Sequence, residues 1–424
     1  NWLHGPNNPN LSRGGLIPVD NDGDGRLDED PPDDLDGDGH ITRMRIEDSF
    51  GEWRVDPKYP DYLMVRVEAD ERGEYRMLSE EGIDNDGDGD INEDGPGGYD
   101  PNRNWPYHWQ PEGVQHGAGQ YPFSLPETRA VSEYVLARPN IAAVQSYHNF
   151  GGMILRGPGH GDGDLKPADD ALHAFIAERG EAMLPGYRSM VTWKDLYQVH
   201  GGEFDWFYGA LGIVSFTNEL FTQRNYYHDD MQDDQRDRAA FMRYLLQNEG
   251  LTPWAEFEHP QLGTIEIGGT HKTFGRVPPS FMLEEELHRN MAFTLYHAEC
   301  MPRLVVGDVQ VTALGVGVRR VRVAVENHGL IPTRIAQDID NKITPRDVAT
   351  LSGPGICVLK GGVVQDADLD KVAWQKIRPG RLLVESVPGN DRLWVEFLVE
   401  GAGEATFRFE ATKGGAVEAD VTVQ

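Results

Sequence analysis

Four short stretches in the middle of the chain carry side chains suited to hydrolytic chemistry. "YDPNRNWP" (99–106) contains Arg103, "SYHNFGG" (146–152) contains His148, "LYQVHGG" (196–202) contains Tyr197, and "SFTNEL" (215–220) contains Glu219. A guanidinium binds carboxylates bidentately, an imidazole binds metals or carries protons, and a carboxylate can act as a general base. Each stretch also has a structural explanation when taken singly, because a histidine after a strand is more often packed than a ligand.

His200 and Glu203, in "VHGGEFDW" (199–206), have the spacing H-x-x-E. That pattern supplies two ligands in many zinc peptidases. Two consecutive glycines separate the pair, and glycine leaves the backbone loosely specified. We therefore interpret the match as coincidental, and opportunistic metal binding near the mouth of a site is the remaining alternative.

Several longer motifs occur in a fixed order along the chain. They are "NRN" followed by an aromatic residue (102–105), "S-x-H" (146–148), "Y-Q-x-x-G-G-x-x-D-W" (197–206) and "S-F-T-x-E-L" (215–220). Together they resemble the M14 family of zinc carboxypeptidases, which have the carboxypeptidase A-like fold. "SLPETRAV" (124–131) and "IEIGGTHKTFG" (265–275) resemble its bacterial secreted branch. The resemblance covers roughly residues 99–300.

The resemblance implies a role for each residue that matches a family motif. His148 would be a zinc ligand, and Glu219 would be the general base that takes a proton from the zinc-bound water. Asn102, Arg103 and Tyr197 would hold the free C-terminal carboxylate of a peptide, the expected substrate.

Two further positions follow from the resemblance. The family stabilises the developing oxyanion with an arginine upstream of "NRN", and Arg13 is the first candidate here, with Arg45 the second. The floor of the side-chain pocket would be Phe204, which favours apolar or small C-terminal residues, although the neighbouring Glu203 could also point inward.

The first two zinc ligands of the family come from an H-x-x-E motif before "NRN". Residues 1–98 contain His4 and His40 but no H-x-x-E. A catalytic zinc site normally has three protein ligands, so zinc is expected only if the missing ligands are supplied.

Three explanations for this departure remain open, and we favour the first. In the first, the chain, which begins at Asn1, is a fragment of a secreted metallocarboxypeptidase, inactive as given, with its cleaved N-terminal piece as a partner. In the second, it is a non-catalytic, calcium-stabilised extracellular structural or assembly protein built on a carboxypeptidase fold. In the third, it is an enzyme with a different site. Association with a second copy of the chain also stays open.

Asp-rich loops near the beginning of the chain predict bound calcium. "DNDGDGRLDED" (20–30) and "DNDGDGDINED" (84–94) agree at eight of eleven positions, and "DLDGDGHI" (34–41) is a shorter relative. Alternate Asp residues separated by Gly let a tight loop wrap a hard cation, although none of the loops ends in the Glu that an EF-hand requires. The expected calcium ligands are Asp20, Asp22, Asp24, Asp28, Asp34, Asp36, Asp38, Asp84, Asp86, Asp88 and Asn92.

Composition excludes some partners. The formal net charge of −31 argues against nucleic acid and anionic membrane surfaces. The sequence has no apolar run of membrane-spanning length. Cys300 and Cys357 are too few for a disulfide framework, and pairing of the two stays open.

The remaining question is which elements position these residues. Buried strands are predicted at 141–148 and 212–220, and helices at 169–184, 233–250 (capped by Gly250) and 280–300. This alternation predicts an α/β domain with a largely parallel or mixed central sheet. The resemblance implies a carboxypeptidase-like mixed sheet flanked by helices, incomplete at its N-terminal side. After Pro302 the pattern alternates apolar and polar residues, which predicts an antiparallel β-sandwich. The predicted domains are 1–300, with the Asp-rich insertion at 14–98, and 303–424.

Overall fold

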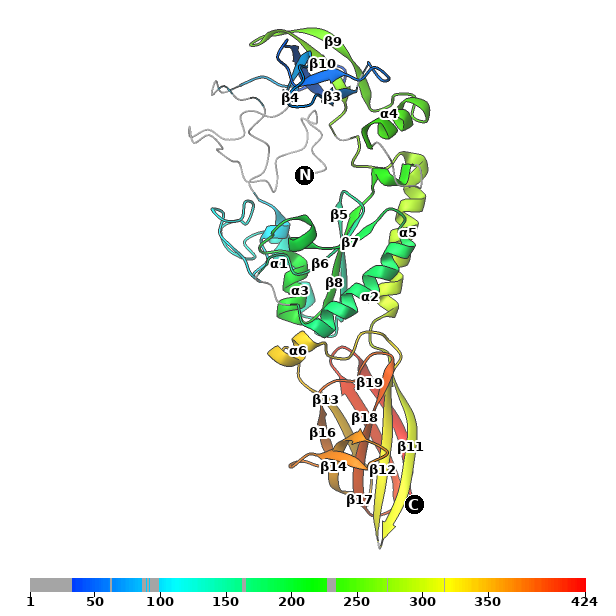
Figure 1. The fold of residues 1–424 in the computed structure, drawn as a ribbon. Coiled ribbons are helices and arrows are strands. Elements are labelled where there is room, and N and C mark those ends of the chain that lie inside the picture. Colours follow the sequence, from blue (N-terminus) through cyan, green and yellow to red (C-terminus); the bar gives the residue numbers. More distant parts are fainter. Residues whose placement is uncertain are drawn as a thin grey trace. The chain divides into compact units, whose positions relative to one another are not determined.

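The computed structural model describes residues 33–61, 63–85, 89, 91, 99–161, 165–226, 234–272, 274–315 and 317–424. The chain divides into two compact units (Figure 1). The first takes in residues up to 100, 149–152 and 220–286, and the second takes in 101–148, 153–219 and 287–424. The predicted domain 1–300 therefore contributes to both units.

The first unit contains a six-stranded antiparallel sheet with the strand order β3-β2-β4-β1-β10-β9. Met44 pairs with Ile267 where β1 meets β10, and the side chains of Met44, Ile265 and Ile267 form a buried cluster. The elements of this unit are β1 Arg43–Glu47, β2 Trp53–Val55, β3 Met64–Arg66, β4 Tyr75–Glu80, η3 Gln223–Tyr226, α4 Asp234–Tyr244, β9 Leu251–His259 and β10 Gly263–Thr270.

The helix predicted over 233–250 is too long, because α4 ends at Tyr244. Gln247 and Asn248 adopt left-handed backbone conformations, with φ of 53° and 64°, which break the helix before β9. Gly250 does not cap α4. It precedes β9 with φ +109°, and a Cβ at this position would lie 2.2 Å from the Phe274 ring.

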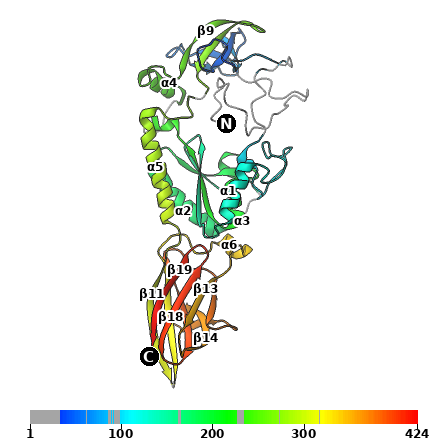
Figure 2. The same cartoon turned by 180° about the vertical axis from the view of Figure 1, so that it is seen from behind.

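The second unit begins with a four-stranded mixed sheet in the order β5-β8-β6-β7. Helices α1 and α3 lie on one side of this sheet and α2 and α5 on the other (Figures 1 and 2). The elements are η1 Pro101–Arg103, α1 Pro126–Leu136, β5 Ala143–Asn149, β6 Met153–Arg156, α2 Pro167–Met183, β7 Arg188–Val191, η2 Thr192–Leu196, α3 Glu203–Leu211, β8 Val214–Leu220 and α5 Ser280–Glu299. The beginning of α5, up to Glu286, belongs to the first unit. The predicted strands and the helices at 169–184 and 280–300 are thus present.

Two apolar clusters hold the helices to this sheet. Ile154, Ile176 and Phe293 join β6, α2 and α5 in one of them. Val135 and Trp206 join α1 and α3 in the other. Burial of such side chains contributes roughly 25 cal/mol per Å² of apolar surface removed from water.

The C-terminal part of the second unit is a β-sandwich, as the alternating pattern predicts. Its sheets have the orders β11-β12-β17-β14-β15 and β16-β13-β18-β19 and enclose an apolar core that includes Phe397, Phe407 and Phe409. The elements are β11 Leu304–Gly315, β12 Val318–Asn327, α6 Ala336–Asn341, β13 Asp347–Ser352, β14 Cys357–Asp366, β15 Lys371–Trp374, β16 Arg381–Val384, β17 Asp391–Glu400, β18 Gly403–Ala411 and β19 Gly415–Val423.

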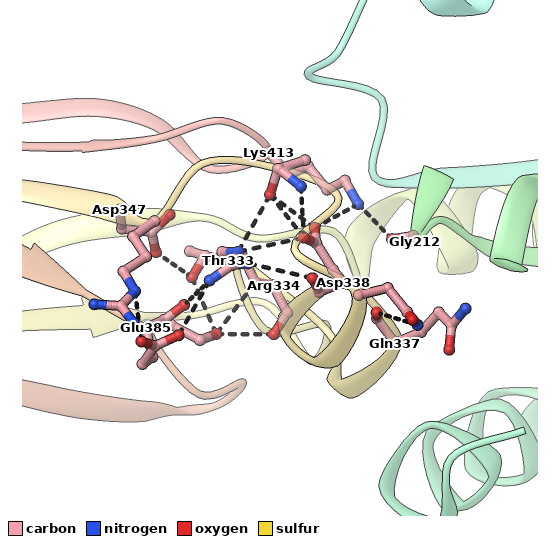
Figure 3. A network of polar contacts seen from close by, with 12 residues as sticks. Gly212, Thr333, Arg334, Gln337, Asp338, Asp347, Glu385 and Lys413 are labelled. Atoms are coloured by element: carbon pink, nitrogen blue, oxygen red, sulfur yellow. Dashed lines mark hydrogen bonds and ion pairs between the residues drawn. The ribbon is translucent and has the colours of Figure 1, made fainter. Parts of the chain in front are cut away.

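A buried polar network joins the sandwich to the α/β part of the same unit (Figure 3). The Lys413 ammonium donates to the carbonyl of Leu211 at 2.9 Å and to that of Gly212, at the C-terminal end of α3. It also pairs at 3.1 Å with Asp338, which is fully buried on α6. Gln337 Nε2 donates to the Gly209 carbonyl at 2.9 Å. The sandwich therefore supports the helix that begins at Glu203.

Cys300 and Cys357 are both free thiols; Cys300 is buried and Cys357 is exposed. Within the described residues, no helix is long and apolar enough to cross a membrane.

Candidate active site

The central sheet of the second unit brings His148 and Glu219 together. His148 lies near the end of β5 and Glu219 near the end of β8, and the two strands are neighbours in the sheet. The Nδ1 atom of His148 lies 3.9 Å from Oε1 of Glu219. Both side chains are largely enclosed, with 31% of the imidazole and 13% of the carboxylate side chain exposed.

Glu203 adds a second carboxylate beside the imidazole. Its Oε1 lies 3.1 Å from Nε2 of His148 and accepts a hydrogen bond from the Thr217 hydroxyl at 3.3 Å. Glu203 is the first residue of α3, which directs its side chain back towards the strand ends. The imidazole of His148 therefore has a glutamate at each ring nitrogen. Motif reasoning gave Glu203 no contact with His148 and left open only that its side chain could point inward.

The "NRN" stretch and the tyrosine loop meet next to these residues. Arg103 Nη2 lies 3.5 Å from the Tyr197 hydroxyl, and Arg103 Nη1 donates to the carbonyl of Asn102 at 2.8 Å. Tyr197 is 51% exposed, so its ring is accessible from solvent. A guanidinium and a phenol at this spacing can both donate to one carboxylate.

Asn102 has a structural contact in addition to its predicted role. Its Oδ1 accepts the backbone N–H of Glu203 at 2.7 Å. The first N–H groups of a helix have no partner within the helix, so this bond caps α3 from a distant segment. The position of Glu203 thus depends directly on the "NRN" stretch.

Burial sets the electrostatics of this site. It raises the pKa of Glu219 above its ordinary value, while His148 and Arg103 act in the opposite direction and Glu203 adds to the rise. Burial also raises the pKa of Asp205 to about 7, against the lowering effect of the Gly159 N–H. A carboxylate with a raised pKa is suited to accept a proton from a neutral donor.

The side chains of Phe204 and His200 do not join the contacts around His148 described above. Phe204 is only 3% exposed, so its ring belongs to the packed interior, and its role as a pocket floor stays a prediction. His200 Nε2 contacts the Gln198 amide at 3.1 Å, and its ring stacks on His160. The two side chains of the H-x-x-E match at 200–203 therefore have different partners.

The donors around His148 do not fit a complete catalytic zinc site. In the part of the chain that the structure describes, no third histidine, cysteine, aspartate or glutamate converges with His148 and a carboxylate within ligand distance. Each glutamate approaches a different ring nitrogen of His148. Because catalytic zinc normally has three protein ligands, these residues alone hold at most part of such a site.

The other predicted residues lie in the first unit or outside the described residues. Arg45, the second oxyanion candidate, is buried, pairs with Glu266 at 2.6 Å and stacks on Tyr75 and Trp254, so it packs the six-stranded sheet. Asp34, Asp36, Asp38 and Asp84 are described. The remaining predictions lie outside the described residues, namely Arg13, Asp20, Asp22, Asp24, Asp28, Asp86, Asp88 and Asn92.

Comparison with known sequences matches two parts of the chain to protein families. Residues 73–242 match the family Peptidase_M14, described as zinc carboxypeptidase. Over this stretch the chain is similar to the zinc carboxypeptidases. Residues 303–422, which form the sandwich, match a domain of unknown function, DUF8731.

Individual relatives each match a limited part of the chain. Zinc carboxypeptidase A 1 of Anopheles gambiae is 28% identical over 135 residues, 29% of this chain and 31% of that protein. A zinc carboxypeptidase of Simulium vittatum is 29% identical over 137 residues, covering 29% of this chain and 44% of that protein. The crystal structure of thrombin activatable fibrinolysis inhibitor is 28% identical, covers 30% of this chain and 35% of that chain, and has a TM-score of 0.26. The chain thus spans less than half the length of these relatives.

Proposed function

We propose that the site around Arg103 binds the C-terminal carboxylate of a peptide, within a zinc-dependent metallocarboxypeptidase that hydrolyses the C-terminal peptide bond. The observation that carries this proposal is the convergence of His148, Glu219, Arg103 and Tyr197 from four separate stretches. Their identities match the motifs of the family to which this stretch is similar.

Arg103 and Tyr197 would bind the substrate carboxylate through charge-assisted and neutral hydrogen bonds. Glu219 would accept the proton of the attacking water, since it is largely buried and lies beside the imidazole. Zinc, when bound with ligands in addition to His148, would polarise the scissile carbonyl. Phe204 would favour apolar C-terminal residues.

The proposal includes the finer expectations from the sequence. The protein would act outside the cell, the boundary between its peptidase-like and sandwich domains would lie near residues 300–303, and the Asp-rich loops would bind calcium. A loop with this many carboxylates repels itself without a cation.

Carboxylate recognition can be tested without zinc. We expect the purified chain to bind acetyl-Gly-Phe at least about tenfold more tightly than the C-terminal amide of the same dipeptide, because the amide lacks the charge that Arg103 recognises. Arg103→Met should abolish this preference. Arg129→Met is the matched control, because Arg129 lies exposed on α1 and donates to the Phe123 carbonyl.

Equal binding of acid and amide by the wild-type chain would refute the proposed site. In a form of the protein that supplies the zinc ligands missing from this chain, Glu219→Gln should lower kcat for hydrolysis of the same dipeptide by at least about 100-fold, the usual scale for loss of a general base. Hydrolysis at the wild-type rate would show that Glu219 is not the base.

A further inference from the structure

The short acidic loop at 34–39 is already folded around its own carboxylates. Asp34 accepts the N–H of Gly37 at 2.8 Å through one carboxylate oxygen and that of Gly39 at 2.9 Å through the other. Gly37 and Gly39 have φ of 76° and 91°, a conformation that favours glycine. This turn places the carboxylates of Asp34 and Asp36 near one another.

Glu81 approaches this loop from the end of β4, although nothing in the Asp-rich motif includes it. Its N–H donates to the Thr42 carbonyl at 3.2 Å, and its carbonyl accepts the Asp33 N–H at 3.1 Å. These two bonds hold Glu81 against both ends of the loop. Its side-chain Oε1 accepts the Thr42 N–H at 2.6 Å across 39 residues of sequence.

The second carboxylate oxygen of Glu81 is the unexplained feature. Glu81 is fully buried, and its Oε2 has no hydrogen-bond partner among the described residues. Oxygen atoms of Asp34, Asp36 and Glu81 all lie within 4.8 Å of one another. A buried, unpaired carboxylate is costly, and two neighbouring carboxylates increase that cost.

The neighbouring side chains add further negative charge around Glu81. Asp36, Asp34 and Asp38 all lie close enough to Glu81 to act on its carboxylate electrostatically. Asp38 itself turns elsewhere, accepting the Thr252 hydroxyl at 2.8 Å. The three members of the cluster, Asp34, Asp36 and Glu81, are all acidic.

We propose that Asp34, Asp36 and Glu81 bind one Ca²⁺ ion, with Glu81 as the ligand that closes the loop. Calcium–oxygen bonds measure about 2.3–2.6 Å, so two ligands of one ion lie at most about 5 Å apart, as these oxygens do. The donors are all oxygens, which suit Ca²⁺, and Mg²⁺ would demand a stricter octahedron.

The position of Glu81 explains how a loop without an EF-hand glutamate can hold the ion. Counting from Asp34 as the first position, the twelfth is Arg45, which lies in β1 and pairs with Glu266. A glutamate from β4 would take the place of that missing ligand and would tie the loop to the sheet. The inference rests on the calcium role proposed for the Asp-rich loops and is independent of the peptidase site.

The test counts Ca²⁺ on the whole chain after removal of metal by a chelator. Equilibrium dialysis against CaCl₂ with elemental analysis gives the number of bound ions and their affinities. We expect Glu81→Gln to lose one Ca²⁺ per chain, or to weaken one site at least tenfold. Glu80→Gln is the matched control, because the adjacent Glu80 pairs with Lys272 at 2.6 Å, and this variant should bind as the wild type does.

Two further measurements separate ligand loss from misfolding. The double variant Asp34→Asn/Asp36→Asn should lose the same single ion, and adding Glu81→Gln to it should remove no more. In chelator, Glu81→Gln should unfold at the wild-type temperature or above it, because the buried like charge is gone, while its gain in Tm on adding Ca²⁺ should shrink.

The outcomes distinguish this site from the wider calcium proposal. If the chain binds Ca²⁺ but Glu81→Gln keeps every ion at wild-type affinity, Glu81 is not a ligand and only this inference is overturned. If the wild-type chain binds no Ca²⁺ at millimolar concentration, both calcium proposals are wrong and the peptidase proposal is untouched.

Discussion

The backbone of Gly201 packs directly against the backbone of Arg103. A Cβ on Gly201 would lie 2.4 Å from the Arg103 carbonyl oxygen, and Gly201 has φ +66°. The Trp105 N–H also donates to the Gly201 carbonyl at 3.0 Å. Gly201 of the tyrosine loop is therefore required for this close approach, which fixes the loop to the segment that carries the guanidinium.

Gly201→Ala should weaken both folding and carboxylate binding. The left-handed backbone costs an L-residue about 1–2 kcal/mol, and the collision with a backbone atom should add about 1–3 kcal/mol. Urea denaturation measures the total. Gly263→Ala isolates the backbone cost, since Gly263 has φ +76° and open space around its Cβ position. Equal losses in the two variants would contradict the proposed packing.

Asn102 has a helix-capping contact and a proposed binding role, and two substitutions separate them. Asn102→Ala removes the acceptor for the Glu203 N–H and should cost about 1 kcal/mol of stability. Asn102→Asp keeps an acceptor, so it should retain most of the stability, but its charge should repel the substrate carboxylate. Chemical denaturation and acetyl-Gly-Phe binding measure the two effects. An Asp variant that binds the dipeptide normally would exclude Asn102 from carboxylate recognition.

Lys413 should be essential to the junction between the sandwich and the α/β part. Burial lowers the pKa of Lys413, and Asp338 opposes that effect. Lys413→Met leaves Asp338 buried with Arg334 as its basic partner and removes the donor from the last carbonyls of α3. We expect a loss of about 3 kcal/mol or more in urea denaturation, the scale of a broken buried ion pair. The exposed Lys376→Met is the control, and a loss as small as the control's would refute this role.

Local patterns predict the elements of the second unit well, and contacts distant in sequence explain what they miss. Strand β8 reads as a buried run and α5 as an amphipathic helix, because each signal lies within its own segment. The short strands β1 and β4 carry little pattern of their own, and β1 is completed by pairing with the distant β10.

The same limit applies to the site. The structure places Arg103 beside Tyr197 and His148 beside Glu219, residues that the motifs single out. The contact of Glu203 with His148 spans 55 residues, and no spacing rule contains it. Glu81 is similar, because its link to the acidic loop follows from sheet pairing between β1 and β4.

The stability of the sandwich should fall as pH rises, because of Asp347. Burial raises the pKa of Asp347 to about 7, and Asp338 and Glu385 add to the rise while Thr333 and Arg334 oppose it. The ordinary value of 3.8 applies in the unfolded chain. Between these values the folded state holds a proton that the unfolded state has released, so stability is fully present below about pH 4 and is lost towards pH 7.

Asp347→Asn should remove this dependence, because the amide resembles the protonated acid. Its Oδ1 can still accept the Thr333 hydroxyl, which now donates to Asp347 Oδ2 at 2.6 Å. Urea denaturation at pH 5 and pH 8 should show a wild-type stability that falls by up to a few kcal/mol and a variant that loses less over the same interval. The exposed Asp391→Asn, at the start of β17, controls for the change in net charge. If the variant and the wild type lose stability in parallel, Asp347 is already ionised in the folded protein.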